Sequence, residues 1–180
     1  MEAMSSQIEP RVLFTRDEIA ATVEQLAAEI SNDYRGKNPL LVGILKGSFM
    51  FMADLIRLLD FLLEVEFVRL SSYGSGRETS GKVRVLQGLQ SSINGRNVLV
   101  VEDIVDTGIT VNFLLDYLRK GKPASLKLCA LADKPSRRKV PVTIDYLGFT
   151  VPNKFIVGYG IDWDERFRNL PDICVLEEED

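Results

Sequence analysis

The chain has no histidine, only two cysteines among its 180 residues, and no long hydrophobic run. Cys129 and Cys174 are far apart and lack the spacing of metal ligands, so we expect both to be small buried hydrophobic residues in a reducing compartment. Residues 1–10 lack the apolar core of a signal peptide, and no stretch approaches the roughly 18 apolar residues of a membrane span. We therefore expect a cytoplasmic protein with no membrane partner.

An excess of positive charge is also absent. The chain has 22 Lys and Arg against 26 Asp and Glu, a formal net charge of −4 and an isoelectric point near 5.1. This balance argues against broad binding of nucleic acid, and an anionic substrate would need local Lys, Arg or a cation. The length, with 46% hydrophobic and 27% charged residues, suits a single α/β domain over residues 1–180 with a sizeable core.

The apolar run Val98–Val101 is followed at once by two carboxylates, Glu102 and Asp103. Such a run is typical of a buried parallel strand, and we expect it to end at the two acids, where it opens on a crevice. Next comes a small, hydroxyl-rich loop, Asp106–Thr110, whose backbone N–H groups and threonines suit an anion at a helix N-terminus. Apolar residues then recur at helical spacing until Lys120: Val111, Leu114, Leu115 and Leu118.

Three carboxylates beside an anion site would repel a phosphate unless they face sugar hydroxyls or a divalent cation. A phosphorylated sugar with Mg²⁺ satisfies both conditions. For Asp106 alone, the simpler interpretation is an ordinary capped helix start. The pattern of residues 98–110 as a whole favours the ligand site.

Residues 102–110, which read EDIVDTGIT, resemble the phosphoribosyl-diphosphate (PRPP) signature of type I phosphoribosyltransferases. The resemblance runs from about Val12 to Leu176 and is strongest to the bacterial hypoxanthine-guanine branch, because adenine enzymes typically carry a small residue at the position of Asp106. It implies a mostly parallel sheet flanked by helices, with a small hood from N-terminal residues and about 152–176. It also implies that PRPP and hypoxanthine or guanine yield IMP or GMP plus pyrophosphate, with Mg²⁺.

In the family that the chain resembles, paired acids hold the ribose hydroxyls and the next loop holds the 5′-phosphate. The acids correspond to Glu102 and Asp103, and Asp106 is the candidate general base near purine N7. The resemblance assigns Mg²⁺ to Glu102, Asp103 and Asp162. The loop residues that it assigns to PRPP are Asp106, Thr107, Gly108, Ile109 and Thr110.

A second strand, loop and helix are predicted by the apolar run Leu40–Leu45, the turn Lys46-Gly47-Ser48 and the apolar segment Phe49–Leu59. A lysine beside a glycine suits an anion, although a lysine at a strand exit is usually only solvated. The resemblance assigns Lys46, Gly47 and Arg168 to pyrophosphate, with a peptide before the lysine that is often cis. An earlier helix is predicted by the capping box Thr15–Glu18, with an end near residues 32–36.

Residues 71–82 follow a predicted strand and are rich in serine and glycine, so we expect an exposed loop. The resemblance assigns to this segment a lid over PRPP, with Ser72 and Tyr73, whereas a plain hairpin loop is the alternative. Gly76–Lys82 reads GxxxxGK, but Val83 replaces the required Ser or Thr and a strand follows, which excludes a P-loop. A haloacid-dehalogenase-type phosphatase is disfavoured. That class has two aspartates one residue apart after the strand, whereas Asp103 and Asp106 are separated by two residues.

The predicted strand Leu126–Ala132 ends at a segment rich in charge that contains Lys134. A solvated basic loop is one interpretation. The resemblance instead assigns Lys134 to the 6-oxo group of the base, where an ammonium would disfavour the 6-amino group of adenine. It assigns base stacking to Phe155 and recognition of the base edge to the backbone of Ile156, and it counts Asp162 among the residues of the purine site.

Two alternatives share this pattern. A xanthine-guanine phosphoribosyltransferase can carry the same signature, and base competition would separate the two. A non-catalytic regulator of the same fold would bind RNA or a repressor partner without turnover. For either enzyme we expect a homodimer or a homotetramer, as in proteins that the chain resembles.

Overall fold

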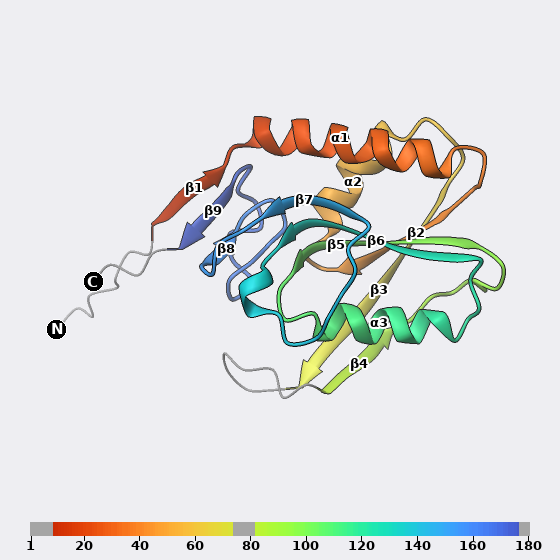
Figure 1. Ribbon diagram of the computed structural model, residues 1–180. Helices are drawn as coiled ribbons and strands as arrows, with labels where there is room; N and C mark the ends of the chain where they lie inside the picture. The colour runs from red at the N-terminus through yellow and green to blue at the C-terminus, as the bar shows by residue number, and fades with distance from the viewer. Residues whose placement is uncertain (1–8, 74–81, 177–180) are drawn as a thin grey trace.

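The computed structural model describes residues 9–73 and 82–176 (Figure 1). The elements in this part of the chain are β1 Pro10–Phe14, α1 Arg16–Tyr34, β2 Leu40–Leu45, α2 Phe49–Leu58, β3 Glu64–Tyr73, β4 Lys82–Gln87, β5 Asn97–Val105, α3 Ile109–Arg119, β6 Ser125–Asp133, the 3₁₀ helix η1 Pro135–Arg137, β7 Tyr146–Thr150, β8 Phe155–Val157 and β9 Ile173–Leu176.

The larger sheet has the strand order β4-β3-β2-β5-β6-β7. All neighbouring strands in it are parallel except β3 and β4, which pair antiparallel. Helices α1 and α2 cover one face of the sheet and α3 covers the other (Figure 1). The predicted α/β fold, with a mostly parallel sheet flanked by helices, is confirmed, and β5 lies at its centre.

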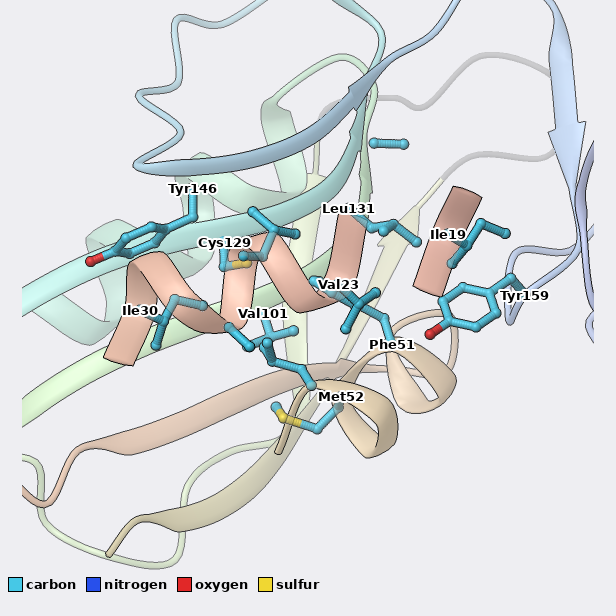
Figure 2. Packing of buried hydrophobic residues seen from close by; sticks show 14 of the residues in the cluster. Ile19, Val23, Ile30, Phe51, Met52, Val101, Cys129, Leu131, Tyr146 and Tyr159 are labelled. Atoms are coloured by element: carbon cyan, nitrogen blue, oxygen red, sulfur yellow. The ribbon is translucent and has the colours of Figure 1, made fainter. Parts of the chain in front are cut away.

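The core follows from apolar strands that are buried on both faces. Residues Val98–Val101 of β5 are fully buried, and alternate side chains enter the two hydrophobic clusters on opposite faces of the sheet. Figure 2 shows α1 and α2 packed on the first face, with Val23 and Phe51 beside Val101 and Cys129. Both cysteines are free and buried, as expected.

The three predicted helices are present. Helix α1 begins after the capping box, in which the Thr15 hydroxyl accepts a hydrogen bond from the Glu18 backbone N–H and Glu18 accepts one from the Thr15 N–H. This arrangement satisfies backbone donors that a helix start leaves without partners. The apolar stripe of α1 is then buried: Ile19, Val23, Leu26 and Ile30.

A small sheet of β1, β9 and β8 joins the two ends of the described chain. Its strands are antiparallel, and Pro10 pairs with Leu176 at one end of the β1–β9 ladder. Both β8 and β9 fall within residues 152–176, for which we expect a hood. None of the helices in the described residues is long and apolar enough to cross a membrane.

Two expectations about element ends are wrong. Strand β5 continues through Glu102 and Asp103 to Val105, because its ladder with β6 extends beyond the acids. Residues 71–73 belong to β3 rather than to a loop, since pairing with β4 extends that hairpin and sets Ser71 opposite Arg84. The remainder of the predicted lid, residues 74–81, lies outside the described residues.

Candidate active site

Glu102 and Asp103 are the centre of the candidate site. Each is only 7% exposed and lies in the second half of β5. Burial, followed by the adjacent Asp103 carboxylate, raises the pKa of Glu102 well above its ordinary value. The Glu102 Oε2 atom is buried and has no hydrogen-bond partner among the described residues. A buried acceptor of this kind is costly unless a ligand satisfies it.

A cavity of about 210 Å³ opens beside the two acids. Its floor is the loop before α3, in which Gly108 has a φ of 82° that favours glycine. Among the described residues no side chain caps α3, and the Thr107 hydroxyl accepts a hydrogen bond from the Ile109 N–H at 3.4 Å. The lining residues are Ile44, Glu102, Asp103, Ile104, Asp106, Thr107, Gly108, Thr110 and Val111.

The turn after β2 lies directly against the acids. The Leu45–Lys46 peptide bond is cis. A Cβ atom at Gly47 would overlap the Asp103 carboxylate, and a Cβ atom at Gly160 would overlap the Gly47 carbonyl. Contacts at glycine backbone therefore bring three distant segments together: the turn after β2, the end of β5 and the loop after β8.

Charged side chains of the loop after β8 pair with one another and with Lys46. The Arg168 guanidinium donates to the Gly160 carbonyl at 2.8 Å and pairs with Asp162 at 2.8 Å. Glu165 pairs with Lys46 at 2.8 Å and with Arg168 at 3.3 Å. Hydrogen bonds from Lys46 and then Arg168 lower the pKa of Glu165, which is therefore a carboxylate at neutral pH.

The predicted purine-reading residues are also adjacent. Lys134 is 6% exposed, and its Nζ atom donates to the Lys154 carbonyl at 2.8 Å. Burial lowers the pKa of Lys134, and the nearby Asp106 carboxylate opposes that shift. Phe155, the next residue after Lys154, is 46% exposed, while Ile156 is buried. The buried Lys134 ammonium thus contacts the residue that precedes the exposed Phe155 ring.

The structure also identifies site residues that sequence reasoning missed. Arg137 Nε forms an ion pair with Asp106 Oδ1 at 3.2 Å. This buried oxygen accepts no hydrogen bond from the residues that the structure describes. Arg138 Nε donates to the Asp106 carbonyl at 3.1 Å, and its guanidinium also pairs with Asp133. Their position three and four residues after Lys134 could have indicated them as site residues. The short helix η1 turns the chain there, so that both arginines contact Asp106 near the end of β5.

Not every expected grouping is present. Among the described residues, no three His, Cys, Asp or Glu side chains are close enough to hold a metal ion, so Glu102, Asp103 and Asp162 do not form a preformed cage. Ser72 and Tyr73 are the last residues of β3, and the rest of their predicted lid is not described. A larger cavity of about 480 Å³ lies between α1, α2 and the loop after β8, and contains none of the predicted site residues.

The fold and this site together define a phosphoribosyltransferase of type I, with paired acids before a threonine-rich helix start. The family model described as the phosphoribosyl transferase domain matches residues 13–164. The chain is 45% identical over 167 residues to the hypoxanthine-guanine phosphoribosyltransferase of Bacillus subtilis, which covers 93% of each protein. It therefore belongs to the hypoxanthine-guanine phosphoribosyltransferase family.

Two further comparisons agree. A hypoxanthine phosphoribosyltransferase structure from Staphylococcus aureus superposes with a TM-score of 0.90 at 41% identity, covering 97% of both chains. The bifunctional protein TilS/HprT of Listeria monocytogenes is 46% identical over 99% of this chain. The chain spans about a quarter of that longer protein, 27% of its length.

Proposed function

We propose that the protein transfers the phosphoribosyl group of PRPP to hypoxanthine or guanine, with IMP or GMP and pyrophosphate as products. One observation supports this proposal above the others. The buried pair Glu102 and Asp103 opens into a cavity that continues to the uncapped start of α3. Carboxylates suit the ribose hydroxyls, and the residues 106–110 suit the 5′-phosphate at a helix N-terminus.

Mg²⁺ fits the same residues. Glu102 has a buried oxygen with no hydrogen-bond partner in the described part of the chain, and carboxylate oxygens are ligands that Mg²⁺ prefers. We assign Glu102, Asp103 and Asp162 to it, with substrate oxygens and water as its remaining ligands, because Mg²⁺ sites commonly combine one or two carboxylates with phosphates. When bound, Mg²⁺ would neutralise negative charge on the departing pyrophosphate.

The reaction breaks the bond from C1′ to pyrophosphate and forms a bond from C1′ to purine N9. Positive charge develops on the ribose and negative charge on the leaving group, so catalysis depends mainly on positioning and electrostatics. Lys46, the Gly47 backbone and Arg168 are assigned to the leaving group. Their proximity to Glu102 and Asp103 through the Gly47–Asp103 contact supports this assignment.

Purine recognition is assigned to Lys134, Phe155 and Ile156. The Lys134 ammonium would donate to the 6-oxo group, whereas the 6-amino group of adenine would present a donor to a donor. The exposed ring of Phe155 suits stacking on the base. Asp106 is assigned to purine N7, where its carboxylate accepts the proton that the base loses as N9 attacks.

The decisive experiment measures pyrophosphate release from PRPP and Mg²⁺ with hypoxanthine, guanine, xanthine, adenine or no base. We expect release with hypoxanthine and guanine and none with adenine. Strong turnover of xanthine would favour a xanthine-guanine enzyme instead. If folded protein that binds PRPP released no pyrophosphate with any base, the result would favour a non-catalytic regulator of this fold.

Small-molecule substrates are the partners that this proposal requires. A homodimer or homotetramer and a cytoplasmic location stay predictions. Sedimentation velocity of the purified protein measures the first, and fractionation of cells that express the chain measures the second.

A further inference from the structure

Glu165 links the two cations that we assign to pyrophosphate. Its carboxylate lies 2.8 Å from Lys46 Nζ and 3.3 Å from the Arg168 guanidinium. Lys46 follows β2 and Arg168 follows β8, so one carboxylate connects segments that are far apart in sequence. A carboxylate and a phosphate present similar anionic oxygens to such cations.

The side chains of this cluster differ in how firmly they are held. The Arg168 side chain is 18% exposed and is anchored by the Gly160 carbonyl and by Asp162. The Glu165 side chain is 64% exposed and the Lys46 side chain 50% exposed. The Glu165 backbone N–H donates to Asp162 Oδ2 at 2.8 Å, which holds the chain at this position. Rotation of the Glu165 side chain alone would therefore free Lys46 and would leave Arg168 paired with Asp162 only.

Rotation of the Glu165 side chain would change the net charge of the cluster. Lys46 and Arg168 carry two positive charges, and Asp162 and Glu165 balance them. While Glu165 is in place, the four side chains have no net charge to attract an anion. With Glu165 turned away, a net positive charge faces the position assigned to pyrophosphate.

We propose that Glu165 is a resident anion of the pyrophosphate subsite, which occupies Lys46 and Arg168 when no diphosphate is bound and exchanges with pyrophosphate in each turnover. This inference rests on the proposed function. Glu165 competes with pyrophosphate for the same cations, so it weakens pyrophosphate binding and accelerates product release. It is a positioning residue, since it acts through Lys46 and Arg168.

The test compares Glu165→Gln with wild type. The substitution keeps the size of the side chain and removes its charge. We expect the dissociation constant for pyrophosphate with Mg²⁺, measured by calorimetry, to fall by about three- to tenfold, as the loss of two partly exposed ion pairs implies. In the reverse reaction, the KM for pyrophosphate should fall by a similar factor, while the KM for IMP stays unchanged. Glu165→Asp, which retains the charge, should return both values towards wild type.

The matched control is Asp164→Asn. Asp164 is the adjacent acid, is exposed, and makes none of the ion pairs found among residues 9–73 and 82–176. Equal tightening by Asp164→Asn and Glu165→Gln would overturn the proposal, because general charge would explain both. Unchanged pyrophosphate affinity of Glu165→Gln, with wild type active on hypoxanthine, would also overturn it. Wild type inactive on every base would instead overturn the proposed function.

Discussion

Asp106 is the residue to which we assign proton transfer, and its surroundings are cationic. Arg137 pairs with Asp106 Oδ1 at 3.2 Å. The buried Lys134 ammonium is also close, since the charge of Asp106 opposes the fall that burial causes in the pKa of Lys134. In the proposed reaction the Asp106 carboxylate accepts a proton from the base.

Asp106→Asn is expected to lower kcat by on the order of 10² or more, with little change in the affinity for PRPP, because the amide cannot accept the proton. Steady-state kinetics with hypoxanthine and a titration with PRPP measure the two effects. Asp116→Asn, an exposed acid of α3 that pairs with Arg119, is the control and should retain full activity. Wild-type turnover of Asp106→Asn would remove Asp106 from the chemistry.

Lys134→Ala is expected to raise the KM for hypoxanthine by about tenfold or more and to relax discrimination against adenine, since a charged donor to the 6-oxo group is lost. Base competition assays at fixed PRPP measure both. Lys139→Ala, an exposed lysine a few residues later, should change neither. An unchanged KM for hypoxanthine in Lys134→Ala would contradict its assigned role.

At the scale of elements, the site depends on how closely separate segments approach. Gly47 lies between the Asp103 carboxylate on β5 and Gly160 in the loop after β8. A Cβ atom at Gly47 would overlap the carboxylate, and a Cβ atom at Gly160 would overlap the Gly47 carbonyl. The turn after β2 is therefore coupled to the end of β5 and to the loop that carries Asp162 and Arg168.

Gly47→Ala is expected to lower the free energy of unfolding by about 1–3 kcal/mol, the usual cost of overpacking, and to lower kcat as the turn moves from Asp103. Urea unfolding and steady-state kinetics measure these effects. Gly36→Ala is the control: Gly36 has a φ of 79° but open space around it, so stability should fall by about 1 kcal/mol without a change in kcat. Normal activity of Gly47→Ala would show that the close contact is not required.

Most elements could be predicted because their signals are local. The run Val98–Val101 and the capping box Thr15–Glu18 predict β5 and α1 from adjacent residues alone. The exact end of β5 could not be predicted, since Glu102 and Asp103 read as a strand exit while the ladder with β6 carries the strand further. Strand β1 was missed for the same reason: its pairing partner, β9, lies at the other end of the chain.

The site shows the same division. The residues 102–110 are recognisable from sequence as a continuous signature. The link of Glu165 to Lys46 is a contact over 119 positions, and only the assembled fold reveals it. Likewise, nothing adjacent in the chain signals that Gly47 must lie against Asp103.

At the scale of the whole molecule, acid stability depends on carboxylates that the fold pairs with cations. Asp33 at the end of α1 accepts hydrogen bonds from Lys127 at 2.6 Å and from the Tyr146 hydroxyl. The bond from Lys127 comes first among the causes that lower the pKa of Asp33. A carboxyl whose pKa is lower in the folded state stabilises the fold above its unfolded pKa, about 3.9, and loses that contribution as pH falls through the folded value.

Asp33→Asn is therefore expected to flatten the fall of the unfolding free energy below about pH 4, where wild type loses the Asp33 contribution. At pH 7 the variant should be less stable by at most about 1 kcal/mol, because the pair is partly exposed. Urea unfolding from pH 3 to pH 7 measures the profile. Glu24→Gln on the same helix should follow the wild-type profile, and a profile of Asp33→Asn that matches wild type would contradict the expectation.

The pairing of β1 with β9 has a consequence for the order in which the molecule is assembled. A ribosome releases β1 before the other described elements, yet its partner in the small sheet, β9, is the last of these elements to be made. Contacts between such distant segments form late, since the cost of closing the intervening chain must be met before they add stability. The large sheet can therefore fold before β9 has been made, whereas the small sheet that includes Phe155 and Ile156 must wait for β9.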